Sequence, residues 1–187
     1  GTGVWYAASS STPGGSTSTL WGNSTDTPVA ADYDGDGKTD IAVWRPGTGI
    51  WYVRPSSVPG TYTAKKWGAA SDFPLPADYD GDGSADMAAW RAATGVWYVL
   101  PSAAAGNYTA TQWGAATDIG VPADYDGDGK SDIAVWRPGT GTWYVRPSAS
   151  AGTYTARAWG LSSALPIPGD YDGAGNAATA VWRPGPG

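Results

Sequence analysis

Residues 32–45 read DYDGDGKTDIAVWR, and related stretches return three more times along the chain. They are DYDGDGSADMAAWR at 78–91, DYDGDGKSDIAVWR at 124–137 and the altered DYDGAGNAATAVWR at 170–183. Each copy starts 46 residues after the previous one, without a gap. Self-similarity at a fixed period of this size indicates a repeat protein, in which every unit is one small supersecondary structure.

The aromatic residues follow the same period and predict four short strands in each unit. In the second unit these strands run from Pro76 to Tyr79, Asp86 to Arg91, Val96 to Leu100 and Tyr108 to Trp113. Segments such as IAVW and IWYV are rich in β-branched and aromatic residues with little polar alternation, as expected when both faces of a sheet are buried. Because four-stranded units stacked around an axis bury both faces, we predict an all-β fold, a β-propeller of four-stranded blades.

The phase of the repeat divides one blade between the two ends of the sequence. We interpret residues 1–187 as a single propeller domain with whole blades at 28–68, 74–114 and 120–160 and a composite blade from 166–187 plus 1–22. Pairing the two halves within one chain closes a four-bladed propeller. Pairing them between chains, by terminal-strand exchange, gives a larger ring or an open filament, with the protein itself as the partner. The sequence leaves both arrangements open.

Composition excludes several functional classes. Cysteine and histidine are both absent, which removes thiol nucleophiles, thiolate or imidazole metal sites and histidine acid–base catalysis. The carboxylates are all Asp and most belong to the repeated loops, so we expect no enzyme activity. A formal net charge of −6 disfavours nucleic acid as a partner, and no apolar run is long enough for a membrane span.

The acidic stretches have the spacing of a calcium loop. Asp occupies positions 1, 3, 5 and 9, and Gly at positions 4 and 6 permits a sharp turn. Four carboxylates brought together repel one another by about 1 kcal/mol per pair in water, which a hard cation with oxygen ligands would relieve. An EF-hand is excluded because Val43 stands at position 12, where that loop needs Glu.

We therefore predict about three Ca²⁺ sites, each with four carboxylates and the backbone carbonyl of position 7. The predicted ligands are Asp32, Asp34, Asp36, Lys38 and Asp40; Asp78, Asp80, Asp82, Ser84 and Asp86; and Asp124, Asp126, Asp128, Lys130 and Asp132. The fourth loop keeps Asp170 and Asp172 but has Ala174 and Ala178 at positions 5 and 9, so calcium binding there is expected to be weak or absent.

The pattern D-Y-D-G-D-G-x-x-D-I-A-V-W-R followed by G-T-G-x-W-Y-V resembles the FG-GAP/VCBS repeat family of bacterial surface and secreted proteins. The acidic loop is also similar to the calcium loops of integrin α-subunit propellers. The resemblance covers essentially the whole chain and implies a propeller, structural calcium and an extracellular setting. Propellers of this family commonly have about seven blades, so four units leave the blade number open.

These observations favour a non-catalytic, calcium-binding, secreted or cell-surface module. Its expected role is that of a scaffold, an adhesion module or a self-assembling structural unit. The alternative is a carbohydrate-binding, lectin-like propeller with glycans as partners, because aromatic faces beside Asp, Asn and Arg suit sugar rings.

Overall fold

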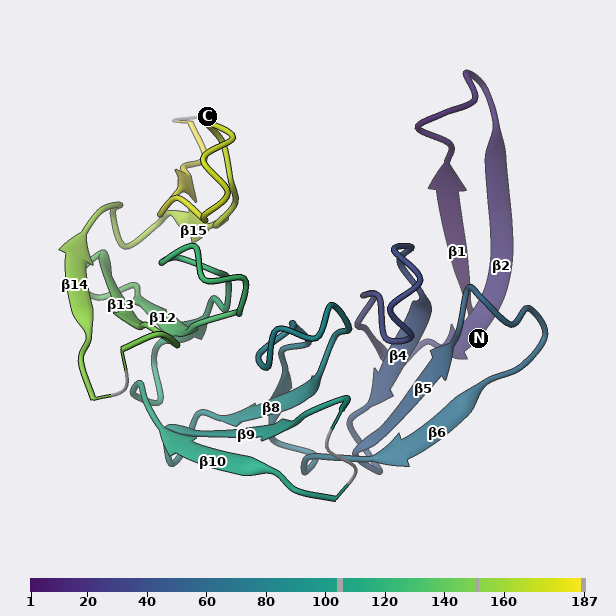
Figure 1. The fold of residues 1–187 in the computed structure, drawn as a ribbon, viewed down its shortest axis with the longest axis horizontal. Helices are drawn as coiled ribbons and strands as arrows, with labels where there is room; N and C mark the ends of the chain where they lie inside the picture. Colours follow the sequence, from purple (N-terminus) through teal and green to yellow (C-terminus); the bar gives the residue numbers. More distant parts are fainter. Residues whose placement is uncertain (104–105, 151, 186–187) are drawn as a thin grey trace.

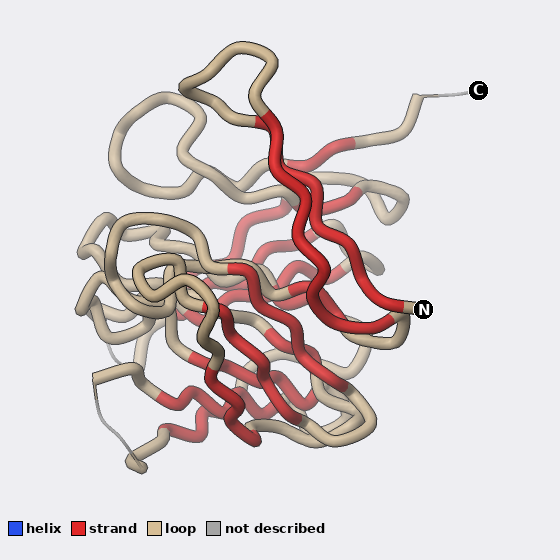
Figure 2. Tube along the Cα trace, turned by 90° about the vertical axis from the view of Figure 1, so that its right-hand side faces the viewer, coloured by secondary structure: helices blue, strands red, loops and turns tan. Residues whose placement is uncertain are grey.

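The computed structural model describes residues 1–103, 106–150 and 152–185, and every regular element in them is a β-strand (Figures 1 and 2). The sequence predictions that extend over 104–105, 151 and 186–187 lie outside the described residues at those positions. No helix in the described part of the chain is long and apolar enough to cross a membrane.

The strands form three four-stranded antiparallel sheets and two separate strand pairs. Sheet 1 contains β3 (Thr27–Pro28), β4 (Ile41–Arg45), β5 (Ile50–Arg54) and β6 (Thr63–Lys66). Sheet 2 contains β7 (Phe73–Pro74), β8 (Met87–Arg91), β9 (Val96–Leu100) and β10 (Thr109–Gln112). Sheet 3 contains β11 (Ile119–Gly120), β12 (Ile133–Arg137), β13 (Thr142–Arg146) and β14 (Thr155–Ala158). The N-terminal pair is β1 (Thr2–Ala8) with β2 (Ser16–Asn23), and the C-terminal pair is β15 (Leu165–Pro166) with β16 (Val181–Trp182).

The prediction of four strands per unit is confirmed, but the first strand differs from its expected position. The sequence predicted a strand from Pro76 to Tyr79, whereas β7 covers only Phe73–Pro74 and is followed by a single bridge between Ala77 and Asp86. Pro76 has no N–H to donate to a ladder, and the loop begins to curl at Asp78. The strand is therefore interrupted between two short stretches of pairing.

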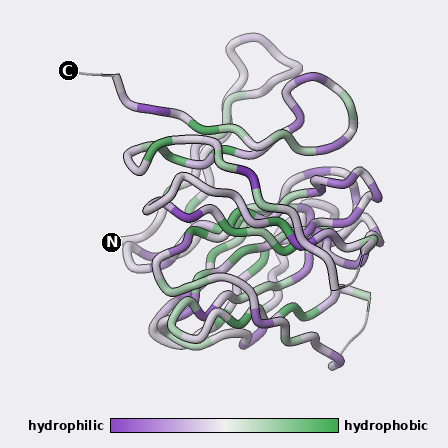
Figure 3. The backbone as a smooth tube through the Cα atoms, turned by 90° about the vertical axis from the view of Figure 1, so that its left-hand side faces the viewer, coloured by the Kyte–Doolittle hydropathy of each residue, from purple (hydrophilic) through white to green (hydrophobic). Residues whose placement is uncertain are grey.

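The central strands of each sheet are buried on both faces, as their sequence predicted. Trp51, Trp97 and Trp143 have no exposed surface, and the Trp of the preceding strand is almost as deeply buried. One hydrophobic cluster joins Trp90 and Trp97 of sheet 2 to Val135 of sheet 3, so the core lies between sheets as well as within them. Figure 3 shows hydrophobic segments through the middle of the molecule, with many hydrophilic ones in the loops at its right-hand edge.

From the N-terminal pair to sheet 3, each sheet is joined to the next by the same indole hydrogen bond. The Trp at the end of one unit donates its Nε1–H to a backbone carbonyl in the third strand of the next sheet. The donor and acceptor pairs are Trp21 and Tyr52 at 3.3 Å, Trp67 and Tyr98 at 3.1 Å, and Trp113 and Tyr144 at 3.2 Å.

The sheets follow one another along an open arc, with the N-terminal pair and the C-terminal pair at its two ends (Figure 1). Strands β4, β8 and β12 lie toward the inside of the arc, and β6, β10 and β14 lie toward its outside. The two strand pairs are the halves that the repeat phase predicted, and they form separate two-stranded sheets. Closure into a propeller remains a prediction.

Candidate metal centre

The acidic loops are residues 32–40, 78–86, 124–132 and 170–178, called loops 1 to 4 below. Each connects the first and second strands of its unit, and Figure 1 shows them along the concave side of the arc. The Gly residues at positions 4 and 6 have positive φ in every loop, for example 72° at Gly35 and 82° at Gly37. Residues other than Gly rarely adopt this backbone conformation, so glycine at these two positions permits the tight curl of the loop.

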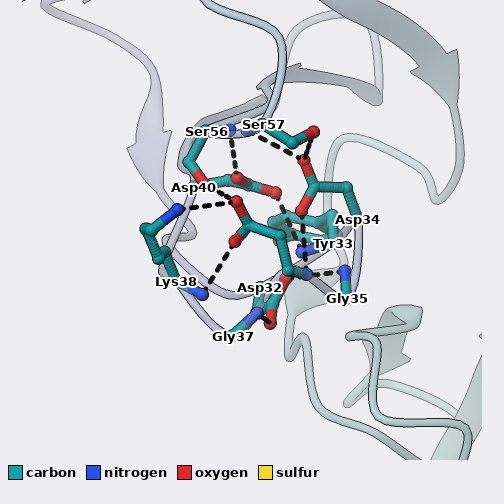
Figure 4. A network of polar contacts seen from close by, with 10 residues as sticks. Asp32, Tyr33, Asp34, Gly35, Gly37, Lys38, Asp40, Ser56 and Ser57 are labelled. Carbon is teal, nitrogen blue, oxygen red and sulfur yellow. Dashed lines mark hydrogen bonds and ion pairs between the residues drawn. The ribbon is translucent and has the colours of Figure 1, made fainter.

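The Asp at position 1 organises the backbone of its own loop. In loop 1, the Asp32 carboxylate accepts hydrogen bonds from the N–H groups of Gly35 at 2.7 Å and Gly37 at 2.8 Å. Asp78 and Asp124 accept the same pair of bonds in loops 2 and 3. Figure 4 shows Asp32 beside these two glycines, and the loop is therefore wrapped around one of its own carboxylates.

The Asp at position 9 is buried and ties the loop to its sheet. Asp40 accepts hydrogen bonds from the backbone N–H of Tyr33 at 2.9 Å and from that of Ser56 at 2.7 Å. Asp86 and Asp132 make the equivalent pairs of bonds. The carboxylate thus joins its loop to the segment after the third strand of the same sheet.

Burial also changes the acidity of this position. Loss of solvent raises the pKa of Asp86 and Asp132, and nearby loop carboxylates raise it further, against the opposing effect of the two backbone hydrogen bonds. The contributing neighbours are Asp80 and Asp78 for the first and Asp126 for the second. A cation placed among these groups would favour their charged form.

The Asp at position 5 is held by a serine that the sequence analysis did not identify. The hydroxyl groups of Ser56, Ser102 and Ser148 donate to Asp36, Asp82 and Asp128 at 2.8, 2.6 and 2.7 Å. These hydroxyl bonds are the largest cause of a lowered pKa at all three carboxyl groups. The signal was available in the sequence, because the three serines are 46 residues apart.

The Asp at position 3 is bound less uniformly. Asp34 accepts a hydrogen bond from the Ser57 hydroxyl at 2.5 Å, and Figure 4 shows its side chain extending toward the Ser56–Ser57 segment. In loop 3, Asp126 instead accepts from the backbone N–H of Ala149 at 3.3 Å.

Three carboxylates of each intact loop come close enough to share one cation. Their ligand atoms lie within 4.8 Å of one another in the groups Asp32, Asp34 and Asp36; Asp78, Asp80 and Asp86; and Asp124, Asp126 and Asp132. Oxygens bound to one calcium ion at about 2.3–2.6 Å are separated by no more than about 5 Å. The donor set, its spacing and its charge therefore fit a divalent cation with oxygen ligands.

The remaining predicted ligands lie in the same loops but outside these groups. They are Asp40, Asp82 and Asp128, together with the position 7 residues Lys38, Ser84 and Lys130. The position 7 residues donate their backbone N–H to the position 5 carboxylate at 2.8 Å, and the Lys38 ammonium pairs with Asp36 at 3.2 Å. Ligation by their carbonyl groups stays a prediction.

Loop 4 keeps the shape of the others without their full set of carboxylates. Asp170 accepts from Gly173 at 2.8 Å and from Gly175 at 3.0 Å, and both glycines have positive φ. Ala174 and Ala178 stand where the other loops have Asp. These backbone hydrogen bonds lower the pKa of Asp170, so its charged form is stabilised by the loop itself.

The loops are also hydrogen-bonded to one another. The backbone carbonyl of each position 1 Asp accepts from the position 8 N–H of the following loop. The pairs are Asp32 with Ala85 at 2.5 Å, Asp78 with Ser131 at 2.6 Å, and Asp124 with Ala177 at 2.5 Å. The candidate centres therefore form one continuous row.

A second set of acidic residues, spaced 46 residues apart, has a structural role. Asp26, Asp72 and Asp118 are each bound by both the Nε and an Nη of one arginine, at 2.8 and 2.9 Å. The arginines are Arg45, Arg91 and Arg137, and each also lies over a Tyr ring. The Arg45 hydrogen bond is the largest cause of the lowered pKa of Asp26. These carboxylates are occupied by arginine and lie outside the candidate metal groups.

Comparison with known proteins gives one result. Residues 32–89 match the family described as FG-GAP-like repeat, a segment from loop 1 into the second strand of sheet 2. No curated protein and no solved structure matches the chain. The match begins at the first residue of loop 1 and includes both of the first two acidic groups. Residues 32–89 are therefore an FG-GAP-like repeat, as the sequence resemblance implied.

Proposed function

We propose that this protein is a non-catalytic, calcium-binding propeller module that acts outside the cell as a structural scaffold. The observation that carries the proposal is the triple recurrence of an acidic group whose oxygen atoms lie within 4.8 Å of one another. A single Asp-Gly turn needs no ion. Each of the three groups contains a buried or half-buried carboxylate, and in each the carboxylates repel one another, a repulsion that a bound calcium ion would relieve.

The chain's own residues indicate what bound calcium would stabilise. Position 1 curls the loop, position 5 is held by a serine of the β5–β6 segment or its equivalent, and position 9 fixes the loop to its sheet. An ion held by these groups would connect the curl of the loop to two segments of the same sheet. Because the ion binds the folded arrangement, it stabilises the protein against unfolding.

The scaffold role is supported by how the polar groups are used. The described carboxylates of the intact loops accept hydrogen bonds within the loops or from the sheets, and the Asp26, Asp72 and Asp118 carboxylates are paired with arginine. No histidine or cysteine is available for acid–base or nucleophilic chemistry. An extracellular location agrees with this proposal because oxygen-ligand calcium modules there work at high calcium concentration.

Native mass spectrometry after titration with calcium tests the proposal. We expect three ions per chain, and two ions for Asp80→Ala, because Asp80 belongs to the close acidic group of loop 2. The matched control is Asp172→Ala, the same position in loop 4, which should leave three ions bound. Retention of three ions by Asp80→Ala, or no ion bound by the unmodified chain, would contradict the proposed function.

A second candidate function, glycan binding, is favoured by repeated aromatic pockets on the junctions between units. One pocket is lined by Trp21, Arg45, Tyr52 and Tyr62, and its equivalent is lined by Trp67, Arg91, Tyr98 and Tyr108. The Tyr62 and Tyr108 side chains are largely exposed, which leaves aromatic surface for the apolar face of a sugar ring. A glycan array with the unmodified chain and with a Tyr62→Ala and Tyr108→Ala double variant tests it. Binding that is absent, or unchanged in the variant, excludes these pockets.

A further inference from the structure

Each of the two terminal strand pairs corresponds to half of a four-stranded sheet. In sheets 1 to 3, the second strand of the unit pairs with the third, as β12 pairs with β13. In the last unit the second strand is β16, and in the described residues it pairs only with β15. The third strand in the same repeat phase is β1, and within the described part of the chain it pairs only with β2.

Residues of the C-terminal pair are exposed where their equivalents in the whole sheets are buried. Trp182 is 54% exposed, whereas Trp136, at the same position of sheet 3, is 0% exposed. Ile167 is 42% exposed, whereas its equivalent Val121 is 5% exposed. The sequence retains these apolar residues although the described residues leave them uncovered.

Residues of the N-terminal pair are likewise more exposed than their equivalents in the whole sheets. Tyr6 is 81% exposed, and its equivalents Tyr52, Tyr98 and Tyr144 are all partly buried. Trp5 is partly exposed, whereas Trp51, Trp97 and Trp143 are fully buried. The uncovered surface of β1 therefore consists of the residues that would cover β16.

Polar groups at the junction point to the same missing neighbour. Trp159 is 50% exposed and occupies the phase of Trp21, Trp67 and Trp113, whose indoles donate to the following Tyr carbonyl. For Trp159, the Tyr at the equivalent position of the next unit is Tyr6, near the other end of the chain. Arg183 is the equivalent of Arg45, Arg91 and Arg137, which each lie over a Tyr ring. The Tyr in the equivalent position for Arg183 is again Tyr6.

We propose that β15–β16 of one copy and β1–β2 of a second copy combine into one four-stranded sheet. The register follows from sheet 3, in which Val135 pairs with Tyr144 and Trp136 with Trp143. It places Val181 opposite Tyr6 and Trp182 opposite Trp5. The contact is head-to-tail, because each copy offers a different surface at each end, and it therefore generates a ring or a filament.

A second copy is favoured over closure within one chain by the course of the arc. Figure 1 shows the N-terminal and C-terminal pairs at the two separated ends of the open arc. Pairing them within one chain would require the junctions between sheets to bend further. Those junctions are formed by buried Trp residues and by the loop-to-loop hydrogen bonds, which fix the present curvature. Association of two copies preserves them.

Disulfide cross-linking tests both the partner and the register, and it is clean because the chain has no cysteine. Tyr6→Cys and Val181→Cys are made in separate chains and mixed under oxidising conditions. We expect a covalent dimer of mixed composition, and a much lower yield when Ala7→Cys replaces Tyr6→Cys. Val135→Cys with Tyr144→Cys in one chain, at the same register in sheet 3, is the positive control.

This inference goes beyond the proposed function, and the outcomes of the experiment test it separately. A positive control that forms its disulfide while the mixture stays monomeric overturns the inference. So does a dilute Tyr6→Cys, Val181→Cys double variant that links only within one chain. Light scattering of the unmodified chain gives the noncovalent readout: a mass above 19.2 kDa that falls to the monomer in Tyr6→Lys supports the inference. Tyr108→Lys, at an exposed position that packs on Trp67 and not on either terminal strand pair, should keep the larger mass. Calcium binding need not be present for any of these results.

Discussion

Loops 3 and 4 have nearly the same backbone and very different chemistry. Gly127 and Gly129 have φ values of 79° and 86°, and Gly173 and Gly175 have 75° and 87°. In both loops the position 1 carboxylate accepts the N–H groups of these glycines. Loop 3 adds the carboxylates at positions 5 and 9, which loop 4 replaces with Ala.

The difference teaches that shape and charge are separate properties of this loop. The Asp residues at positions 1 and 3 and the two Gly suffice for the curl. The additional carboxylates of loop 3 serve other ends: the buried one accepts two backbone N–H groups, and three acidic side chains gather closely enough to hold an ion. Mutations can therefore convert one loop toward the other without disturbing the turn.

The largest effect is expected from Asp132→Ala, which gives loop 3 the residue that loop 4 has at this position. The backbone N–H groups of Tyr125 and Ser148 then lose a buried acceptor. An unsatisfied buried donor costs about 1–3 kcal/mol, so the free energy of unfolding should fall by about 2–6 kcal/mol. Urea unfolding in the presence of a chelator measures it. Asp132→Asn is the control, and its loss should be smaller because one side-chain oxygen remains. A loss below about 0.5 kcal/mol for Asp132→Ala would mean that these bonds are replaced by water.

A smaller loss is expected from breaking an arginine pair. Arg91→Met leaves the buried Asp72 carboxylate without its partner and should cost about 3 kcal/mol. In the last unit, Ala164 stands where the other units have this Asp, so Arg183→Met should cost less than about 0.5 kcal/mol. Thermal or urea unfolding of both variants makes the comparison. A loss for Arg91→Met as small as that for Arg183→Met would show that the pair with Asp72 adds little to stability.

Restoring loop 4 should add a binding site. Ala174→Asp with Ala178→Asp recreates the missing carboxylates on a backbone that is already curled. Native mass spectrometry should then find four calcium ions instead of three. At a calcium concentration 100-fold above the dissociation constant, the new site should add about 2.7 kcal/mol of stability. Ala174→Asn with Ala178→Asn controls for the change in size. A count that stays at three would show that a loop also needs the segment after the third strand, which holds positions 5 and 9 in loops 1 and 3.

The smallest effect concerns the serine at position 5. The Ser102 hydroxyl is the main cause of the lowered pKa of Asp82, so Ser102→Ala should move that pKa up toward the ordinary value of an aspartate. A lowered pKa in the folded state contributes stability above the ordinary pKa, which is lost as the pH falls through the folded value. The free energy of unfolding of the variant should therefore be slightly lower than that of the unmodified chain at pH 7, and the two should be equal at strongly acidic pH. NMR titration of the calcium-free protein checks the pKa, and an unchanged value would assign the shift to the backbone bond from Ser84.

Much of this structure could be predicted from the sequence because the period is regular. The spacing of Trp44, Trp90 and Trp136 located the second strands, and the acidic pattern located the loops. The short first strand was placed incorrectly. Its residues up to Tyr79 have the apolar character of a strand, but Pro76 and the curl at Asp78 remove the partners that a continuous ladder needs.

The site was predicted only in part because spacing does not determine which carboxylates meet. Asp36 joins the close group of loop 1, whereas Asp86 and Asp132 join those of loops 2 and 3. Ser56 lies 20 residues from Asp36 and reaches it only through the packing of the sheet. The curvature of the arc also depends on such packing, and a repeat period contains no measure of the angle between neighbouring units.

The hydrogen bonds between successive loops have a consequence for cooperativity. Each position 1 Asp curls its loop through its side chain and accepts the next loop through its main chain, as Asp78 does with Ser131. Disorder in one loop therefore removes a partner from its neighbour, and the units behave as a one-dimensional array with nearest-neighbour coupling. Loop 4, although it lacks two carboxylates, is included in this array through the bond from Ala177 to Asp124. Its retained curl thus preserves the end of a chain of dependent units.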